Sequence, residues 1–200
     1  MRQYQSAPPP PAAEMTRRAS VTLATAAAMM ALARPGVSAA ATAEELSSNS
    51  HLALDRLFAL RPEARQWATK ARAILVFPEI VKAGFMVGAQ GGDGALIEKG
   101  KVVGFYRIAA GSFGLQAGAQ KFSYALFFMT QQALDYLKSS NGWSIGSGPS
   151  VVVLDEGAAK SMNTTTMRKD VYAVPFGQKG LMAGLGLEGS KITPIHPKAA

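Results

Sequence analysis

The residues with the most specific chemistry in this sequence form the stretch "GWSIG" at 142–146. Its G-x-S-x-G pattern holds the serine nucleophile of α/β-hydrolases, in which an acid and then a histidine follow along the chain. Here Ser144 is followed by Asp155 or Asp170 and then by His196. The hydrolase mechanism needs a strand before the serine and a helix after it, whereas a predicted helix and an Asn-Gly pair precede Ser144. We therefore expect a turn that leads into a strand, and a protein that is not an enzyme.

Metal and nucleotide binding are the other chemistries to consider. His51 and His196 are the only histidines and lie far apart in the sequence, so we expect no metal site. The chain has no cysteine, which excludes disulfides and thiolate chemistry. The glycine clusters do not run into a Lys-Ser/Thr pair at the start of a helix, as a phosphate loop requires. The sequence thus predicts no cofactor.

Basic residues gather around a predicted helix that follows Pro62. The candidate lipid-binding cations are Arg61, Arg65, Lys70, Arg72 and, just beyond the helix, Lys82. An amphipathic basic element can lie on an anionic membrane surface, where each nearby Lys or Arg contributes on the order of 1 kcal/mol. The alternative is an ordinary solvated helix face that covers the sheet.

A second set of candidates follows from strands in which every second side chain is missing or small. In "GFMVGAQGG" at 84–92, Phe85, Val87 and Ala89 share one face and leave the other nearly bare, and the pattern returns at 111–120 and 180–189. Strand glycines permit bends and close approach of another backbone. Alternatively, the bare face is the floor of a groove for an extended ligand such as an acyl chain. The candidate ligand-contacting positions are Gly84, Gly88, Gln90, Gly114, Gln116 and Gly118.

Residues 1–39 have the features of a Pro-rich leader and a cleavable export signal. Two arginines at 17–18 precede an Ala-rich apolar run, and "VSA" at 37–39 is a small-residue cleavage pattern. The apolar run is too short and too Ala-rich for a membrane-spanning helix. We therefore expect a single exported domain over 40–200, located in the periplasm or at the outer membrane.

The formal net charge of the chain is +8. Cleavage after residue 39 removes four arginines and one glutamate and leaves a formal +5. A basic protein outside the cytoplasm meets phospholipid or lipopolysaccharide, so we expect anionic lipid head groups and peripheral membrane contact, and no nucleic acid.

The predicted elements are two N-terminal helices, a run of strands and one helix in mid-chain. Thr42 and Glu45 form a capping box, Pro62 separates the two first helices, and Thr130 caps a helix over 131–138 that Asn141-Gly142 ends. The predicted strands are "AILVFP" ending at Pro78, a hairpin over 94–108 with Lys99-Gly100 as its turn, a central strand at 122–129, then 150–154, 171–176, 180–189 and 191–195. This order predicts an α+β fold, an antiparallel glycine-rich β-sheet or small barrel with helices to one side.

Three stretches carry a family resemblance: "ARAILVFPEIVKAGFMVGAQGGDGALI", "GFYRIAAGSFGLQAGAQKFSYALFFMTQQALDYL" and "GLMAGLGLEGSKI". Together they resemble the SYLF domain, also called the Ysc84 actin-binding domain, in its exported bacterial form, from about Leu46 to Ile195. The resemblance implies a phospholipid-binding module: eukaryotic relatives bind phosphoinositides, with the N-terminal helical part contributing, and a fungal member binds and bundles actin. It implies no catalytic residues.

These observations predict an exported phospholipid-binding module that docks on anionic lipid through its basic N-terminal helical region. The alternative is a structural or protein-interaction component of the cell envelope without lipid specificity. A protein partner in the envelope is compatible with both.

Overall fold

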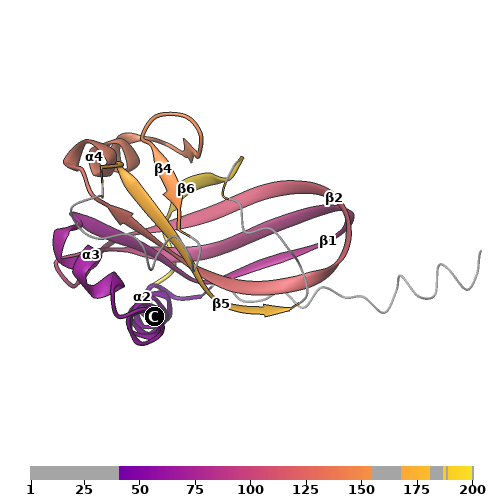
Figure 1. Cartoon of the computed structure of the whole chain (residues 1–200), viewed down its shortest axis with the longest axis horizontal. Helices are drawn as coiled ribbons and strands as arrows, with labels where there is room; N and C mark the ends of the chain where they lie inside the picture. The colour runs from indigo at the N-terminus through magenta and orange to yellow at the C-terminus, as the bar shows by residue number, and fades with distance from the viewer. Residues whose placement is uncertain (1–40, 155–167, 181–186, 188, 200) are drawn as a thin grey trace, which may run out of the picture. The chain divides into compact units, whose positions relative to one another are not determined.

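The computed structural model describes residues 41–154, 168–180, 187 and 189–199. The predicted leader and export signal lie outside these residues. In the described part, three helices and six strands follow one another along the chain (Figure 1). They are α2 (Ala43–Leu60), α3 (Ala64–Lys70), β1 (Ala73–Glu98), β2 (Lys101–Phe128), α4 (Gln131–Ser139), β3 (Trp143–Ser144), β4 (Val151–Val153), β5 (Val171–Gly180) and β6 (Lys191–Ile195). None of these helices has the length and hydropathy that crossing a membrane requires.

Helices α2 and α4 begin where their sequence signals indicate, whereas α3 begins at Ala64, two residues after Pro62. The Thr42 hydroxyl accepts from the Glu45 backbone N–H at 3.2 Å, and the Glu45 carboxylate accepts from the Thr42 N–H at 3.0 Å, which confirms the capping box. At α4, the Thr130 hydroxyl accepts from the Ala133 N–H at 3.3 Å. The predicted left-handed stop at Asn141-Gly142 is wrong, because α4 ends at Ser139 and the next residue is already extended.

Strands β1 and β2 form one long antiparallel hairpin. Lys99 and Gly100 have φ angles of 49° and 79° and connect the paired residues Glu98 and Lys101, which confirms the predicted two-residue turn. The prediction of a strand ending at Pro78 is wrong. Proline lacks an N–H for the ladder, but Pro78 lies at a register shift between Phe77 and Ile80, so β1 continues past it.

The hairpin curls back on itself. A Cβ atom placed on Gly92 or Gly94 would come closer than 3.0 Å to the carbonyl oxygens of Glu79 and Val76 respectively, and 13 or more residues of β1 separate these partners. A straight strand would hold residues 79 and 92 roughly 43 Å apart, at about 3.3 Å per residue. The β1–β2 ribbon therefore bends between them, and the two glycines let one half of β1 pass close to the other half.

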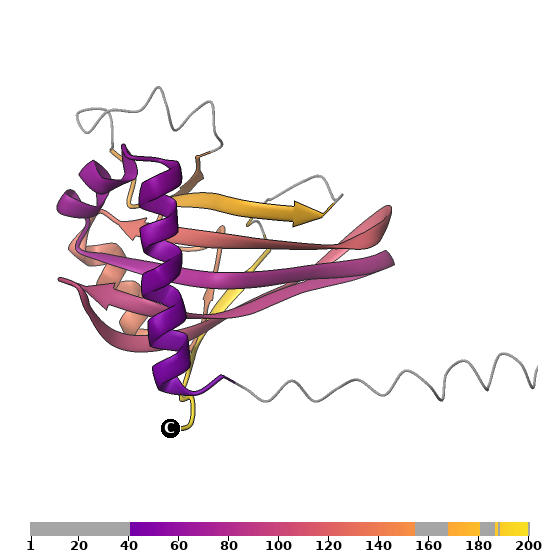
Figure 2. The same ribbon diagram turned by 90° about the horizontal axis from the view of Figure 1, so that it is seen from below.

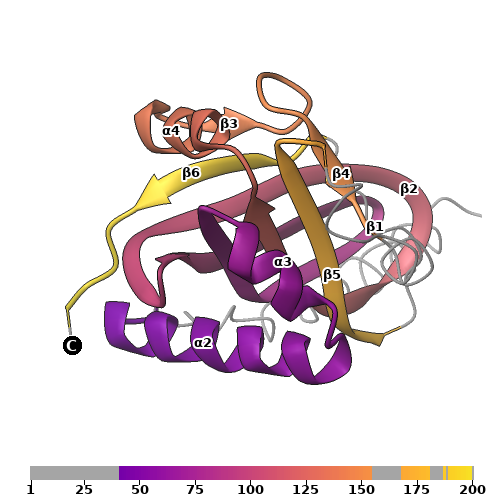
Figure 3. The ribbon, with the colours of Figure 1, turned by 60° about the vertical axis from the view of Figure 1, so that its left-hand side comes forward.

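The sheet is mixed and curled into a half-barrel (Figure 3). Strand β2 pairs with β1 along one side, and along its other side with β6 over 105–109 and with β5 over 120–128. The α+β class is confirmed in this broader form, but the purely antiparallel arrangement is wrong because β4 and β5 run parallel. The strands of the sheet follow the order β3-β6-β2-β5-β4, and β1 pairs with β2 off this path.

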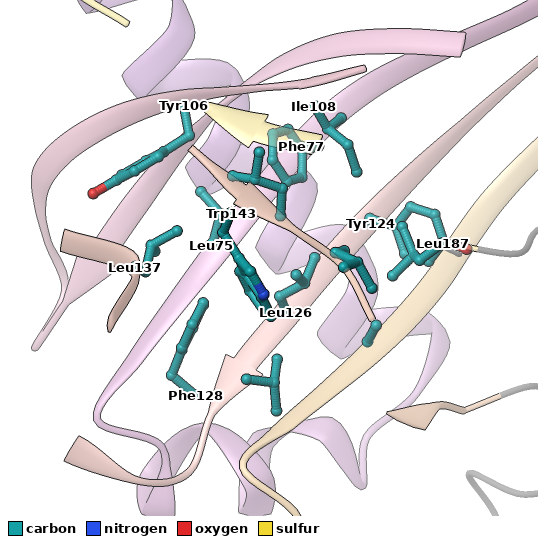
Figure 4. Packing of buried hydrophobic residues seen from close by; sticks show 14 of the residues in the cluster. Leu75, Phe77, Tyr106, Ile108, Tyr124, Leu126, Phe128, Leu137, Trp143 and Leu187 are labelled. Atoms are coloured by element: carbon teal, nitrogen blue, oxygen red, sulfur yellow. The ribbon is translucent and has the colours of Figure 1, made fainter. Parts of the chain in front are cut away.

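Two hydrophobic clusters lie on the two faces of the sheet, as alternation along β1 requires. Leu75 and Phe77 belong to the cluster inside the curl, which α4 and Trp143 complete (Figure 4). Ile74 and Val76 belong to the cluster outside it. Helix α2 crosses the strands on this outer side and contributes Leu54 and Leu57, among others (Figure 2).

Candidate lipid-binding surface

Helix α3 is held to the sheet by one face. Ala64 and Trp67 are buried, and the Trp67 ring meets the Phe127 ring edge-on with 5.9 Å between centroids. The opposite face of this short helix is turned outward. Its side chains line a shallow surface depression of about 370 Å³, formed by Arg65, Gln66, Thr69 and Lys70. Two of the cations predicted from the sequence therefore share one exposed patch.

The predicted cations differ in their surroundings. The Arg65 guanidinium lies 5.0 Å from the centroid of the Phe58 ring on α2, a cation–π contact that fixes its position while the residue stays exposed. Arg72 is also exposed, and its backbone N–H donates to the Phe128 carbonyl at 2.7 Å. Arg61 is half-buried, and its buried Nη1 atom has no hydrogen-bond partner in the described part of the chain.

The ion pairs that the structure describes lie on the strands β1 and β2 and on helix α4. Ion pairs among the described residues join Arg107 to Asp93, Lys121 to Glu79 and Lys138 to Glu98. None involves Arg65 or Arg72. An anionic surface that approaches α3 therefore meets at least two exposed guanidinium groups for which no carboxylate of the described residues competes.

The glycine-faced candidates lie elsewhere, in the bend of the β1–β2 ribbon. Gly84 pairs with Gly118, and Gly114 pairs with Met86, on the two strands of the bend. The Gln116 backbone belongs to β2, and its side chain lies outside the described parts of the structure. Figure 1 shows the bend at the far end of the ribbon from α3. The structure thus separates the predicted residues into two groups, with Lys82 in the bend group.

Gln90 is buried and forms a hydrogen bond with Ser190, the residue that directly precedes β6. Its Nε2 donates to the Ser190 hydroxyl at 3.3 Å, and both residues are less than 10% exposed. Gly88 is half-buried and pairs with Ser112. For the neighbouring Gly92 and Gly94, the close-approach interpretation of the bare face is the correct one.

Ser144 does not lie on the strand–turn–helix elbow that the hydrolase pattern requires, and Asp155 of that pattern lies outside the described residues. Ser144 is exposed on the edge strand β3, and a turn follows it rather than a helix. Asp170 accepts hydrogen bonds from the Ser150 N–H at 2.9 Å, from the Ser150 hydroxyl at 2.7 Å and from the Thr130 hydroxyl at 3.2 Å. The bonds from Ser150 are the main reason that the pKa of Asp170 lies below its usual value. Asp170, which directly precedes β5, is therefore hydrogen-bonded to the residues that directly precede α4 and β4.

Sequence reasoning missed one polar contact that holds α2. The two ring nitrogens of His51 lie 2.9 Å from the Ser47 carbonyl oxygen and 3.2 Å from the Gly100 carbonyl oxygen. His51 thereby links α2 to the hairpin turn. The sequence carried no signal for this link, because the two partners are 49 residues apart.

One family model matches the chain. The Ysc84 family, described as Las17-binding protein actin regulator, matches residues 109–197. This is less than half of the chain, and it runs from the bend of the ribbon in β2 through β6. Helices α2 and α3 and strand β1 precede the matched part. No curated protein matches the sequence.

Proposed function

We propose that this protein is an exported module that binds anionic phospholipid, with the outward face of α3 and the adjoining Arg72 as its docking surface. The observation that carries the proposal is the exposed cation patch of α3, in which the described ion pairs leave Arg65 and Arg72 without a carboxylate partner. The SYLF-like stretches and the Ysc84 match support a domain of this class. Catalysis forms no part of the proposal.

Exposed leucines on helix α2 suit a membrane interface. Leu60, at the end of α2, is 58% exposed, and Leu52 on the same helix is 61% exposed. A leucine that enters the boundary between head groups and acyl chains gains burial that it lacks in water, while neighbouring Lys and Arg remain among the phosphates. Leu60 directly precedes Arg61, the first of the predicted cations, in the sequence.

Charge reversal tests the docking surface. In the R65E/K70E/R72E variant we expect cosedimentation with vesicles of phosphatidylglycerol and phosphatidylcholine to fall by at least about 100-fold in partition coefficient, since three cations contribute roughly 1 kcal/mol each. The K101E/K191E/K198E variant changes the net charge equally at exposed sites outside α3 and should bind as the parent does. Equal binding by both variants would show that α3 is not the docking surface.

A protein-binding function is the second candidate, and a specific observation favours it. The Ysc84 family description names binding to Las17 and regulation of actin, and the match covers a part of the chain that excludes α3. In this case the protein would ignore vesicle composition, and a stable complex with a protein partner would co-purify from the cell envelope. Binding to phosphatidylglycerol vesicles that exceeds binding to phosphatidylcholine vesicles, and that decreases with salt, would select the lipid proposal instead.

A further inference from the structure

A second pair of cations lies at the end of the sheet that carries α3. Strand β1 begins, β2 ends and β5 begins at this end, because Ala73 pairs with Phe128 and Phe128 pairs with Val171. Arg168 and Lys169 precede the start of β5 and are both exposed. Figure 1 shows α3 and the start of β5 at the end of the sheet opposite to the bend. The fold thus brings Arg168 and Lys169 near the cations of α3, although the two groups lie far apart in the sequence.

Backbone hydrogen bonds define the spacing between the two groups of cations. The Arg72 N–H donates to the Phe128 carbonyl at 2.7 Å, and the Met129 N–H donates to the Asp170 carbonyl at 2.8 Å. Arg72 and Asp170 therefore lie on the two sides of Met129, each one strand away from it. Neighbouring strands are about 4.8 Å apart, so the backbones of Arg72 and Asp170 are separated by roughly 10 Å. Arg72 and the residue before Asp170, Lys169, can thus meet one membrane surface at the same time.

The backbone that carries Lys169 is held in place, and its neighbouring carboxylate is already hydrogen-bonded. The Lys169 N–H donates to the Tyr172 hydroxyl at 3.1 Å, and the Asp170 N–H donates to the Ser150 hydroxyl at 3.2 Å. The Asp170 carboxylate accepts from the N–H and the hydroxyl of Ser150. These bonds lower the pKa of Asp170 the most, and the charge of Lys169 contributes the least to this lowering. Asp170 therefore depends mainly on neutral donors rather than on Lys169.

The cations of this end come from two separate parts of the chain. Arg168 and Lys169 belong to the part that the Ysc84 family model matches, whereas α3 precedes it. Neither residue takes part in the ion pairs described above. The positive charge is thus spread across α3, the start of β1 and the start of β5. Such a distribution suits a surface that carries many phosphates better than it suits one small anion.

We propose that Arg168 and Lys169 form the second half of the lipid-docking surface, so that the protein meets an anionic membrane with the end of the sheet at which β1 and β5 begin. Phosphates of several phospholipids accept from the cations of α3 and from Arg168 and Lys169 together. The bend of the ribbon then points away from the membrane. The inference rests on the proposed function and adds to it a docking element outside the N-terminal helices.

Cosedimentation of the full chain with mixed phosphatidylglycerol and phosphatidylcholine vesicles tests the two residues. R168E/K169E should bind at least about 10-fold more weakly than the parent, since each Lys or Arg near the surface adds to binding. K179E/K191E is the matched control, because it changes the net charge equally at exposed positions, one of them at the other end of β5, and it should bind as the parent does. R168K/K169R keeps both charges and should also bind as the parent does.

Equal binding by R168E/K169E and the parent overturns the inference and leaves docking by α3 in place, because R65E/K70E/R72E tests α3 separately. A loss in R168K/K169R as large as that in R168E/K169E also overturns it, since the side chains would then act through their shape. Absence of parent binding to these vesicles overturns the proposed function together with the inference. Should circular dichroism show that R168E/K169E is unfolded, R168Q/K169Q takes its place with an expected loss of at least about 5-fold.

Discussion

Substitution of Gly94 tests the curl of the β1–β2 hairpin. A Cβ at this position would meet the Val76 carbonyl oxygen inside 3.0 Å and the Phe77 ring at 2.6 Å, where ordinary contact begins at 3.4 Å. Backbone cannot yield as a flexible side chain does, so G94A must push the two halves of β1 apart. Overpacking of this kind costs about 1–3 kcal/mol. For a domain of this size, that lowers the melting temperature by roughly 2–12 °C.

Gly111 provides the matched control within the same hairpin. Nothing lies within 4 Å of a Cβ placed there, and the residue has no positive φ angle. G111A should therefore be neutral or stabilise by up to about 1 kcal/mol, because alanine reduces the entropy of the unfolded chain. Urea denaturation followed by circular dichroism measures both variants. Equal free energies of unfolding for G94A and G111A would refute the close approach of the two halves of β1.

Three further variants test individual contacts. D170N should be less stable than the parent at pH 7, because the lowered pKa of Asp170 stabilises the folded protein when the carboxyl group is ionised. This difference in stability should vanish as the pH falls through the pKa of Asp170 in the folded protein, which lies below 3.8. Denaturation at a series of pH values measures the difference. Burial raises the pKa of Tyr124 above 10.0, so stability should fall as the pH rises past that value, and Y124F should reduce this loss in thermal melts at alkaline pH. T42A removes the capping-box hydroxyl and should cost about 1 kcal/mol in urea denaturation; an unchanged midpoint would contradict the cap.

Local signals predicted the elements well. The capping box at Thr42, the cap at Thr130 and the Lys99-Gly100 turn each depend on residues a few positions apart, and all three are present in the structure. The central position of 122–129 also followed from a strand that is apolar on both faces, and its residues pair with β1 and β5.

Long-range pairing was the part that the sequence could not supply. Pro78 is a local break signal, and the single strand of Ala73–Glu98 exists because β2 accompanies it on both sides of a register shift. The parallel pairing of β4 with β5 is fixed by contacts such as those of Asp170 with Ser150, which are 20 residues apart. The alternation of glycines indicated either close approach of another backbone or the floor of a groove. At Gly94 the nearby Val76 carbonyl oxygen shows that close approach is the correct interpretation.

The candidate site was predicted only in part, because spacing along the sequence does not determine long-range contacts. Proximity in sequence placed Arg65 and Lys70 on one helix, and the structure puts both beside one depression. Lys82 was grouped with the cations of the helix because it follows them closely in the sequence, but it lies on β1 beside the bend, and the bend depends on the pairing of the whole hairpin.

Hydrogen exchange of the purified protein, with and without vesicles, is the most direct measurement of lipid docking by α3. With phosphatidylglycerol vesicles, peptides that cover residues 61–72 should exchange more slowly, and with phosphatidylcholine vesicles they should not change. Slower exchange confined to β3–β6, or an equal effect of both lipids on residues 61–72, would contradict docking through the cations of α3.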